Sequence, residues 1–129
     1  MAVPNPTEGE LAILKILWAN HGPCSVRDVH ALLSQSKDTA YTTVLKMMTI
    51  MAEKGLVERD ESTRVHLYRA LYPEPVIQSL LIKDLVRKAF SGSALQLVQR
   101  ALETEPATAA DLDNIAKLIA DAKKRRGNR

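Results

Sequence analysis

Residues 38–55, with the sequence DTAYTTVLKMMTIMAEKG, constrain this chain more than any other stretch. Four apolar residues recur there at the spacing i, i+3, i+4, i+7, which predicts an amphipathic helix with one buried face. They are Val44, Met47, Met48 and Met51. Asp38 or Thr39 is placed to cap the beginning of the helix, and Gly55 is placed to end it in a left-handed conformation. We therefore expect one face of this helix to pack into a body while the other face is presented outward.

The outward face of this helix has an unusual composition. It carries Thr42, Lys46, Thr49 and Glu53, flanked by Thr39 and Thr43. Threonine is a poor helix former, so a face that is merely solvated more often carries Glu, Lys, Gln and Arg. Short hydroxyls beside one lysine suit a helix that enters the DNA major groove, where threonine contacts phosphates or bases and lysine reaches guanine. From this helix alone, a DNA-binding face and an ordinary solvated face both stay open.

Length and composition indicate one ordinary domain or two small ones. The 129 residues include one Trp, one Phe and three Tyr among 46% apolar residues, which indicates a helix-rich protein with an aliphatic core. The single cysteine, Cys24, excludes an internal disulfide and fits a reducing compartment. Because the chain starts without a signal-peptide pattern and has no apolar run of 18 residues, we expect a soluble cytoplasmic protein without membrane insertion.

The charge is unevenly placed along the chain. Residues 1–72 hold 8 Lys+Arg and 8 Asp+Glu, whereas residues 73–129 hold 10 and 7, which gives the whole chain its net charge of +3. Much of this excess lies in the final KKRRGNR segment, which we interpret as a solvated helix end. Composition alone does not indicate a strongly basic nucleic-acid domain. Any DNA binding by residues 1–72 must therefore depend on where the charges are placed.

Two further helices are expected before residue 38. Thr7 and Glu10 form a capping box, and so do Ser25 and Asp28. After Gly55 the apolar period changes from 3.6 to 2, so residues 56–60 and 65–70 are expected to be short strands joined by a polar tip. Three helices followed by a two-stranded hairpin is the element order of a winged helix-turn-helix domain, in which the third helix recognises DNA and the hairpin is the wing.

Pro73 and Pro75 begin a different, helical region, in which Thr108 and Asp111 form a third capping box. Its first helix, residues 76–90, is apolar over too wide an arc for one buried face, and fewer than 60 residues rarely bury a core alone. We expect a second copy to supply the missing surface. The predicted dimerisation residues are Ile77, Leu80, Leu81, Leu85, Phe90, Leu95, Val98, Leu112, Ile115 and Ile119. The predicted fold class is mainly α with a small antiparallel β-hairpin, in which a winged helix-turn-helix domain, 1–72, precedes a helical dimerisation region, 73–129.

With this order of elements, the sequence resembles the BlaI/MecI/CopY family of bacterial penicillinase-type repressors. The resemblance is carried by residues 10–18 (ELAILKILW), residues 40–44 (AYTTV) and residues 54–59 (KGLVER), with Tyr68 in the second strand. It is tight up to residue 72 and looser beyond. The AYTTV segment with its GLVER continuation is the specific part of the match.

The resemblance implies a dimeric repressor that binds a dyad-symmetric, double-stranded DNA operator near its own promoter. It places the recognition helix in the major groove and the wing along the phosphate backbone. The residues expected to contact DNA are Tyr41, Thr42, Thr43, Lys46, Thr49, Thr63, Arg64 and His66.

The resemblance also implies a mode of derepression. In better-known members a membrane-bound metalloprotease sensor triggers cleavage between an Asn and a Phe near the short helix. The equivalent bond here joins Arg100 and Ala101, and the Asn-Phe pair is absent. The copper-responsive branch carries Cys-x-Cys pairs near its C-terminus, and this chain has none, so no metal sensing is expected.

The sequence contains no catalytic or cofactor-binding pattern, so we predict neither an enzyme nor a cofactor. His21, His30 and His66 are not spaced as metal ligands with Cys24. Cys24 precedes a helix start, where a thiol pKa can be lowered, but we interpret it as a small packing residue. The alternative to a repressor is a winged-helix module that binds a protein through its third helix. A strong dependence of binding on salt distinguishes the DNA-binding reading from this alternative.

Overall fold

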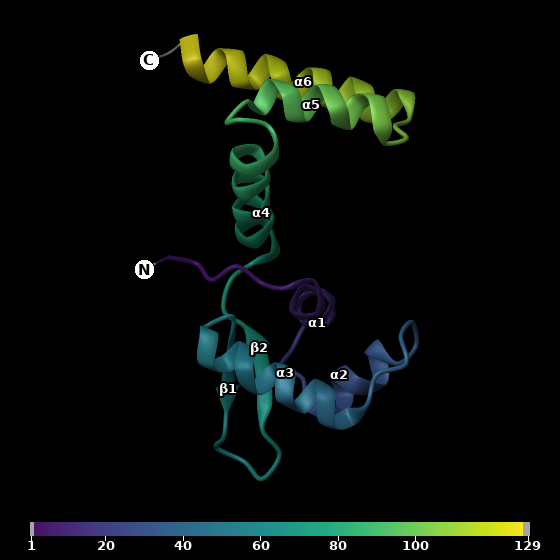
Figure 1. Ribbon diagram of the computed structural model, residues 1–129, viewed down its shortest axis with the longest axis vertical. Coiled ribbons are helices and arrows are strands. Elements are labelled where there is room, and N and C mark those ends of the chain that lie inside the picture. Colours follow the sequence, from purple (N-terminus) through teal and green to yellow (C-terminus); the bar gives the residue numbers. More distant parts are fainter. Residues whose placement is uncertain (1, 128–129) are drawn as a thin grey trace. The chain divides into compact units, whose positions relative to one another are not determined.

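The computed structural model describes residues 2–127 and is mostly helical, with one two-stranded antiparallel hairpin (Figure 1). The elements in chain order are α1 (Glu8–Ala19), α2 (Val26–Leu33), α3 (Tyr41–Lys54), β1 (Val57–Asp60), β2 (Leu67–Ala70), α4 (Glu74–Ala89), α5 (Ala94–Thr104) and α6 (Ala109–Gly127). The predicted fold class, helical with a small antiparallel hairpin, is thereby confirmed. No helix within the described residues is both long enough and apolar enough to cross a membrane.

Capping boxes begin three of the helices as the sequence predicts. The Thr7 hydroxyl accepts from the Glu10 N–H at 3.2 Å, while the Glu10 carboxylate accepts from the Thr7 N–H at 2.8 Å. The same reciprocal pair joins Ser25 to Asp28 before α2 and Thr108 to Asp111 before α6. Each box satisfies two N–H groups that the first helical turn leaves unpaired, which explains why these helices begin where they do.

The start of α3 differs from the prediction. We expected Asp38 or Thr39 to cap it, but the N-cap is Ala40, which offers no side-chain hydrogen bond. The Thr39 hydroxyl donates instead to the carbonyl of Lys37, at 3.4 Å. Gly55 ends the helix as predicted, because its φ of 84° is a left-handed conformation that a residue without Cβ adopts at little cost.

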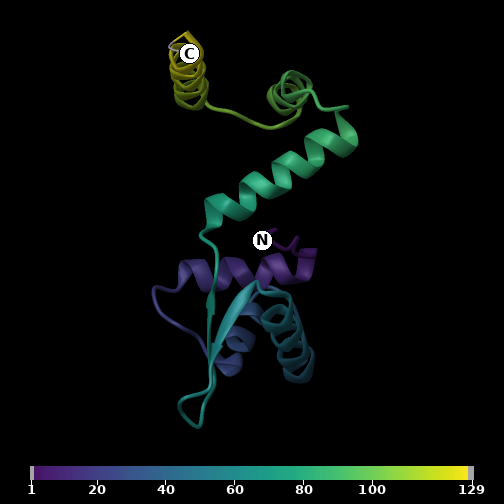
Figure 2. The same ribbon diagram turned by 90° about the vertical axis from the view of Figure 1, so that its left-hand side faces the viewer.

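The hairpin is shorter than predicted. In its antiparallel register Val57 lies opposite Ala70 and Asp60 lies opposite Leu67, so residues 65 and 66 fall outside β2. The reason is that the chain already turns after β1, where the Asp60 carboxylate accepts from the Ser62 N–H at 2.9 Å. Figures 1 and 2 both show the turn of the hairpin extending beyond the helices around it.

The chain divides into two compact units, and the first ends at Asp84. Its core is formed by α1, α2, α3, the hairpin and the first turns of α4. The fully buried side chains include Ile13, Leu14, Val29, Val44, Met48, Met51, Leu56, Tyr68 and Ile77. Ile77 is 1% exposed in this core and Leu81 packs against it. The structure therefore places Ile77 in the core of the first unit and Leu81 against that core, because α4 begins by covering that unit. The sequence had grouped both residues with the dimerisation residues.

A partly buried ion pair connects the end of α3 to the beginning of α1. The Lys54 ammonium at the end of α3 lies 2.6 Å from the Glu10 carboxylate at the start of α1. Lys54 also donates to the Asn5 carbonyl at 3.4 Å, and Val3 packs against the core. Residues 2–6, which precede α1, are thus held to the first unit.

The second unit, which begins at Leu85, consists of the end of α4 together with α5 and α6. None of its described residues is buried. Large apolar side chains on α5 and α6 are instead widely exposed, with Leu95 at 77% and Leu118 at 65%. This unit does not cover its own apolar surface.

Candidate nucleic-acid interface

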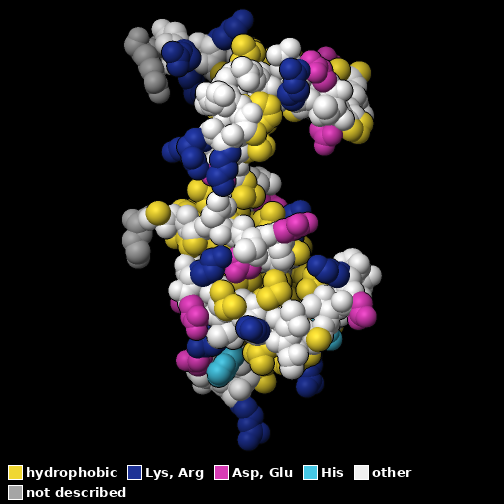
Figure 3. All heavy atoms as spheres, viewed as in Figure 1, with side chains coloured by type: hydrophobic (Ala, Val, Ile, Leu, Met, Phe, Trp, Pro, Cys, Tyr) yellow, Lys and Arg dark blue, Asp and Glu magenta, His cyan; other side chains and the backbone are white. Residues whose placement is uncertain are grey.

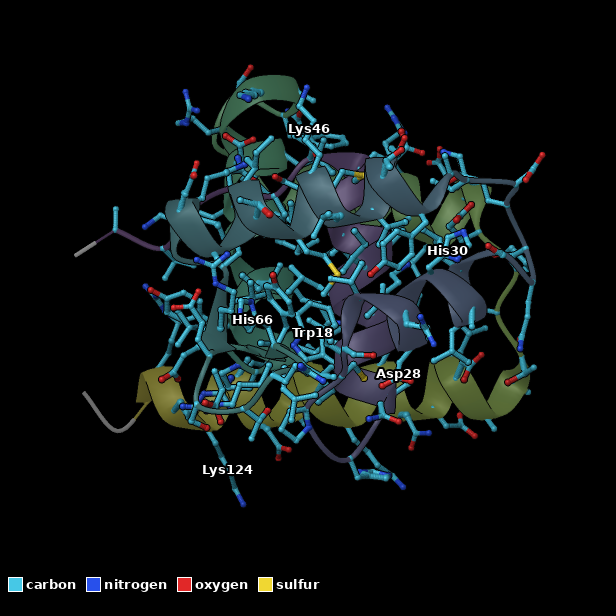
Figure 4. All side chains as sticks on the ribbon, turned by 90° about the horizontal axis from the view of Figure 1, so that it is seen from below. Trp18, Asp28, His30, Lys46, His66 and Lys124 are labelled. Carbon is cyan, nitrogen blue, oxygen red and sulfur yellow. The ribbon has the colours of Figure 1, made fainter. Side chains whose placement is uncertain are left out.

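Part of the outward face of α3 is both exposed and without partners among the described residues. Thr42, Thr43 and Lys46 are exposed, and no described residue forms a hydrogen bond with their side chains. Lys46 projects from α3 on the side away from α2, as seen in Figure 4. Val44, Met48 and Met51 on the opposite side of the same helix are each 0% exposed. The helix thus turns its apolar stripe inward and leaves these donors free for an external partner.

Thr49 and Tyr41 are held more tightly than their neighbours on this face. The Thr49 hydroxyl donates to the carbonyl of Leu45, one turn earlier, at 2.8 Å, and its side chain is only half exposed. The Tyr41 ring meets the His30 ring edge-on, with centroids 5.7 Å apart. His30 in turn lies 2.7 Å from the Thr39 carbonyl, so α2 and the turn before α3 position Tyr41 at the first residue of the helix.

The tip of the hairpin carries the predicted wing residues Thr63, Arg64 and His66, all of them exposed. The Thr63 hydroxyl donates to the carbonyl of Val65 at 2.7 Å, which shapes the turn. His66 Nδ1 lies 3.9 Å from the Glu61 carboxylate. Arg64 has no hydrogen bond or ion pair within the described residues, so its guanidinium is available to an anion.

Ion pairing divides the cations of the first unit into two groups. Arg59 pairs with Glu61 at 3.0 Å, and Arg69 pairs with Glu58 across the hairpin. Hydrogen bonding to Tyr68 and the charge of Glu61 raise the pKa of Arg59 further above its ordinary value. These two arginines are neutralised by acids of the hairpin or its turn, and Lys54 is neutralised by Glu10 of α1.

The second group of cations is unpaired within the described residues: Arg27, Lys37, Lys46 and Arg64, together with Lys15 and Lys83. The first four lie on α2, the turn after it, α3 and the tip of the hairpin. In Figure 3 Lys or Arg side chains stand among hydrophobic ones across the face that α3 and the hairpin present. Unpaired cations on this part of the first unit therefore result from placement, which the equal numbers of acidic and basic residues in 1–72 do not show.

A hollow of about 420 Å³ lies between the start of α2, the first half of α3 and the tip of the hairpin. Predicted residues Tyr41, Arg64 and His66 line it together. Arg27 and Leu45 line it too, and sequence reasoning missed both of them. Leu45 could have been noticed as an apolar residue that lies off the buried stripe of its helix. Arg27 gave no such signal, because an arginine in the first turn of a helix is common.

Cys24 behaves as a packing residue. It is 1% exposed, and its backbone pairs with Tyr68 through hydrogen bonds of 2.9 and 2.8 Å. Burial, with a smaller effect of the Asp28 charge, raises the pKa of its thiol, which opposes formation of a reactive thiolate. Among the described residues, no group of three His, Cys, Asp or Glu side chains is placed to hold a metal ion.

Comparison with known proteins agrees with this geometry. The family model described as "Penicillinase repressor" matches residues 6–121. The chain is 31% identical over 121 residues to the transcriptional regulator BlaI of Mycobacterium tuberculosis (strain CDC 1551 / Oshkosh), covering 93% of this chain and 86% of that protein. It is 20% identical over 113 residues to the methicillin resistance regulatory protein MecI of Staphylococcus aureus (strain N315), covering 88% and 91%. These relatives are named as regulators, not enzymes.

A solved structure gives the same fold for the first unit. The solution structure of the DNA binding domain of the repressor BlaI superposes with a TM-score of 0.50 at 23% identity, covering 57% of this chain and 88% of that chain. The resemblance predicted from residues 10–18, 40–44 and 54–59 is thus confirmed by a match that extends over most of the sequence. This chain belongs to the penicillinase repressor family.

Proposed function

We propose that this protein is a transcriptional repressor that binds a double-stranded DNA operator through α3 and the tip of its hairpin. The observation that carries the proposal is the unpaired Thr42, Thr43 and Lys46 face of α3. The unpaired Arg64 of the hairpin lines one hollow with Tyr41 and Leu45 of the same helix. A helix of this width fits the major groove, where base edges are read, and the hairpin then reaches the backbone. The family relatives named as regulators support the same reading.

Within this proposal the side chains have different tasks. Lys46 and Thr42, which are free and exposed, contact bases or phosphates in the groove. Thr49 and Thr63 have committed their hydroxyl protons to backbone carbonyls, so they contribute as acceptors or through their methyl groups. Tyr41, held by His30, positions the beginning of the helix. Thr43, which is also exposed and unpaired, contacts bases or phosphates beside Thr42. Arg64 binds a phosphate, and His66 flanks that contact.

We infer further that the repressor acts as a homodimer on a dyad-symmetric operator. The support is the second unit, none of whose described residues is buried while its large apolar residues lie exposed. A helix with an apolar stripe needs another surface to cover it, and cyclic dimers are the commonest solution. The residues of the second unit proposed for this contact are Leu85, Leu95, Val98, Leu112 and Ile119, with the partly exposed Phe90 and Ile115. Leu80 of the first unit, also partly exposed, is proposed with them.

The proposal is tested by mobility shift and footprinting on DNA from upstream of the protein's own reading frame. Binding through about six phosphates should weaken roughly 10³-fold between 50 and 200 mM salt. The footprint should show two half-sites about one helical turn apart, with one protomer on each. Failure to protect any sequence at low salt would contradict DNA binding. It would leave the alternative, a winged-helix module that binds protein.

For derepression we propose cleavage within the second unit by a membrane-bound metalloprotease sensor, at or near the bond between Arg100 and Ala101. This bond lies inside α5, where the Arg100 carbonyl accepts from the Thr104 hydroxyl at 2.7 Å and the Ala101 carbonyl accepts from the Glu105 N–H at 3.0 Å. Arg100 also pairs with Glu103 at 2.8 Å. Since these bonds hold the helix, cleavage there requires α5 to unwind locally.

The cleavage proposal is tested by N-terminal sequencing of the fragment formed when the repressor is co-expressed with an activated sensor protease. A fragment beginning at Ala101 is expected. An uncleaved repressor that still leaves the operator under inducing conditions would refute it.

A further inference from the structure

The exposed face of α3 contains an apolar residue that the proposed DNA contacts do not yet use. Leu45 is 41% exposed, although Val44 beside it is completely buried. Tyr41, one helical turn earlier on the same side, is 43% exposed, and Val65 on the hairpin is 57% exposed. A single exposed leucine needs no explanation. Here, however, three apolar side chains from two elements line one hollow of about 420 Å³.

The surroundings of this hollow indicate what occupies it. Arg27 and Arg64 line the hollow with Leu45, and neither has an ion pair within the described residues. The lining thus combines an apolar part with two free guanidinium groups. Such a lining is complementary to a ligand that has an apolar group close to negatively charged groups.

Double-stranded DNA presents such a group in the major groove. The C5-methyl of thymine is the apolar feature of the groove edge, and it lies between two phosphate backbones. The leucine side chain cannot form hydrogen bonds. It therefore favours a base that offers an apolar group, and it disfavours bases whose polar edge groups would face it without a hydrogen-bond partner. Phosphate contacts hold a protein in register on the DNA but carry no sequence information. Sequence is recognised through contacts with the bases, and an apolar contact with a thymine methyl is one of these.

We propose that Leu45 is a specificity-determining residue that selects thymine at one position of each operator half-site, through contact with the thymine methyl. Tyr41 and Val65 flank this contact, and Arg27 and Arg64 bind the adjacent phosphates. This inference rests on the proposed DNA-binding function and identifies the base that one part of the surface reads.

The test replaces single thymines by deoxyuridine, which removes only the methyl group. Each thymine of one footprinted half-site is replaced in turn, and affinities of the full-length protein are measured at fixed salt. At the position read by Leu45, wild-type protein should lose about fourfold in affinity, the value for one buried methyl-sized group. The Leu45→Ala variant should bind the thymine operator more weakly, and it should bind the thymine and deoxyuridine operators equally at that position.

Ile50→Ala provides the matched control. Ile50 is 39% exposed on the same helix but does not line the hollow, so this variant should keep the fourfold penalty. Circular dichroism checks that both variants retain native helicity.

The outcomes separate the two proposals. If wild-type protein protects no sequence, the DNA-binding function itself is wrong. If wild-type protein binds its operator but is indifferent to deoxyuridine at every thymine, the repressor proposal stands and thymine selection is wrong. If Leu45→Ala keeps the full wild-type penalty at every position, another residue reads the methyl and the assignment to Leu45 is overturned.

Discussion

The ammonium of Lys54 lies 2.6 Å from the carboxylate of Glu10, so the last turn of α3 is bonded to the first turn of α1. The Glu10 side chain is 5% exposed and that of Lys54 is 33% exposed. Close by, a Cβ on Gly9 would lie 2.7 Å from the Met47 methyl, so α1 and α3 approach closely here. The orientation of the helix that carries the proposed recognition face is therefore set partly by a polar contact with α1.

Replacing Glu10 by Gln should destabilise the first unit by about 1–2 kcal/mol at neutral pH, because Lys54 then donates to a neutral oxygen instead of a carboxylate and the ion pair is lost. Glutamine still completes the capping box, so this change isolates the charge. Burial raises the pKa of Glu10, but the hydrogen bonds from Lys54 and Thr7 outweigh it, so the pKa lies below its ordinary value of 4.5. The Glu10 carboxylate thus stabilises the folded state fully above pH 4.5, and this stabilisation is lost as the pH falls through the lowered pKa.

Urea unfolding of wild type and Glu10→Gln across pH 2.5–7 measures this difference. The two stability curves should be separated above about pH 5 and should converge in acid. If the difference in the free energy of unfolding were the same at all pH values, the charge of Glu10 would not be its cause.

Replacing Lys46 by Ala should weaken operator binding about fivefold or more, because an unpaired cation on the recognition face is lost. The fold should be unaffected, since Lys46 is exposed and contacts no described partner. Lys15→Ala is the control, because Lys15 is also an exposed and unpaired lysine but lies on α1. Equal affinities for both variants in a mobility shift would remove Lys46 from the interface.

Replacing Arg64 by Ala should lower the slope of log K against log [salt] by about one, because one phosphate contact disappears. The control is Arg69→Ala on the same hairpin. Arg69 is already paired with Glu58, so its removal should leave the slope close to that of wild type. Identical slopes for wild type and Arg64→Ala would show that the hairpin tip does not contact the backbone.

Replacing Ile119 by Asp should shift the protein from dimer to monomer at micromolar concentrations. Ile119 is 49% exposed on α6 in the single chain, and a carboxylate there cannot be buried against a second copy without a large cost. Asn114→Asp, which adds the same charge at an already polar position of the same helix, serves as control. Sedimentation velocity distinguishes the species, and a monomeric wild-type protein would contradict the proposed dimer outright.

Local sequence patterns determined the secondary structure of this protein closely. Capping boxes act over three residues, a glycine with positive φ acts at one residue, and apolar periodicity acts within one element. Hence the beginnings of α1, α2 and α6, the end of α3 at Gly55 and the buried stripe of Val44, Met48 and Met51 were all predictable. The cap of α3 was not, because the competing hydroxyl of Thr39 bonds to Lys37.

Only the tertiary structure determines which residues far apart in the chain contact one another. The periodicity of α4 shows that Ile77 and Leu81 are apolar, but not that the core of the first unit covers them. Sequence likewise lists the cations without showing that Arg59 and Arg69 are neutralised across the hairpin while Arg27 and Arg64 stay free. Sequence shows Leu45 off the buried stripe, but only the fold brings it to one hollow with Val65. The physical reason is the same in each case. Burial and charge neutralisation depend on which surfaces are in contact in the folded protein, whereas the sequence shows only which side chains lie on each face of a helix or strand.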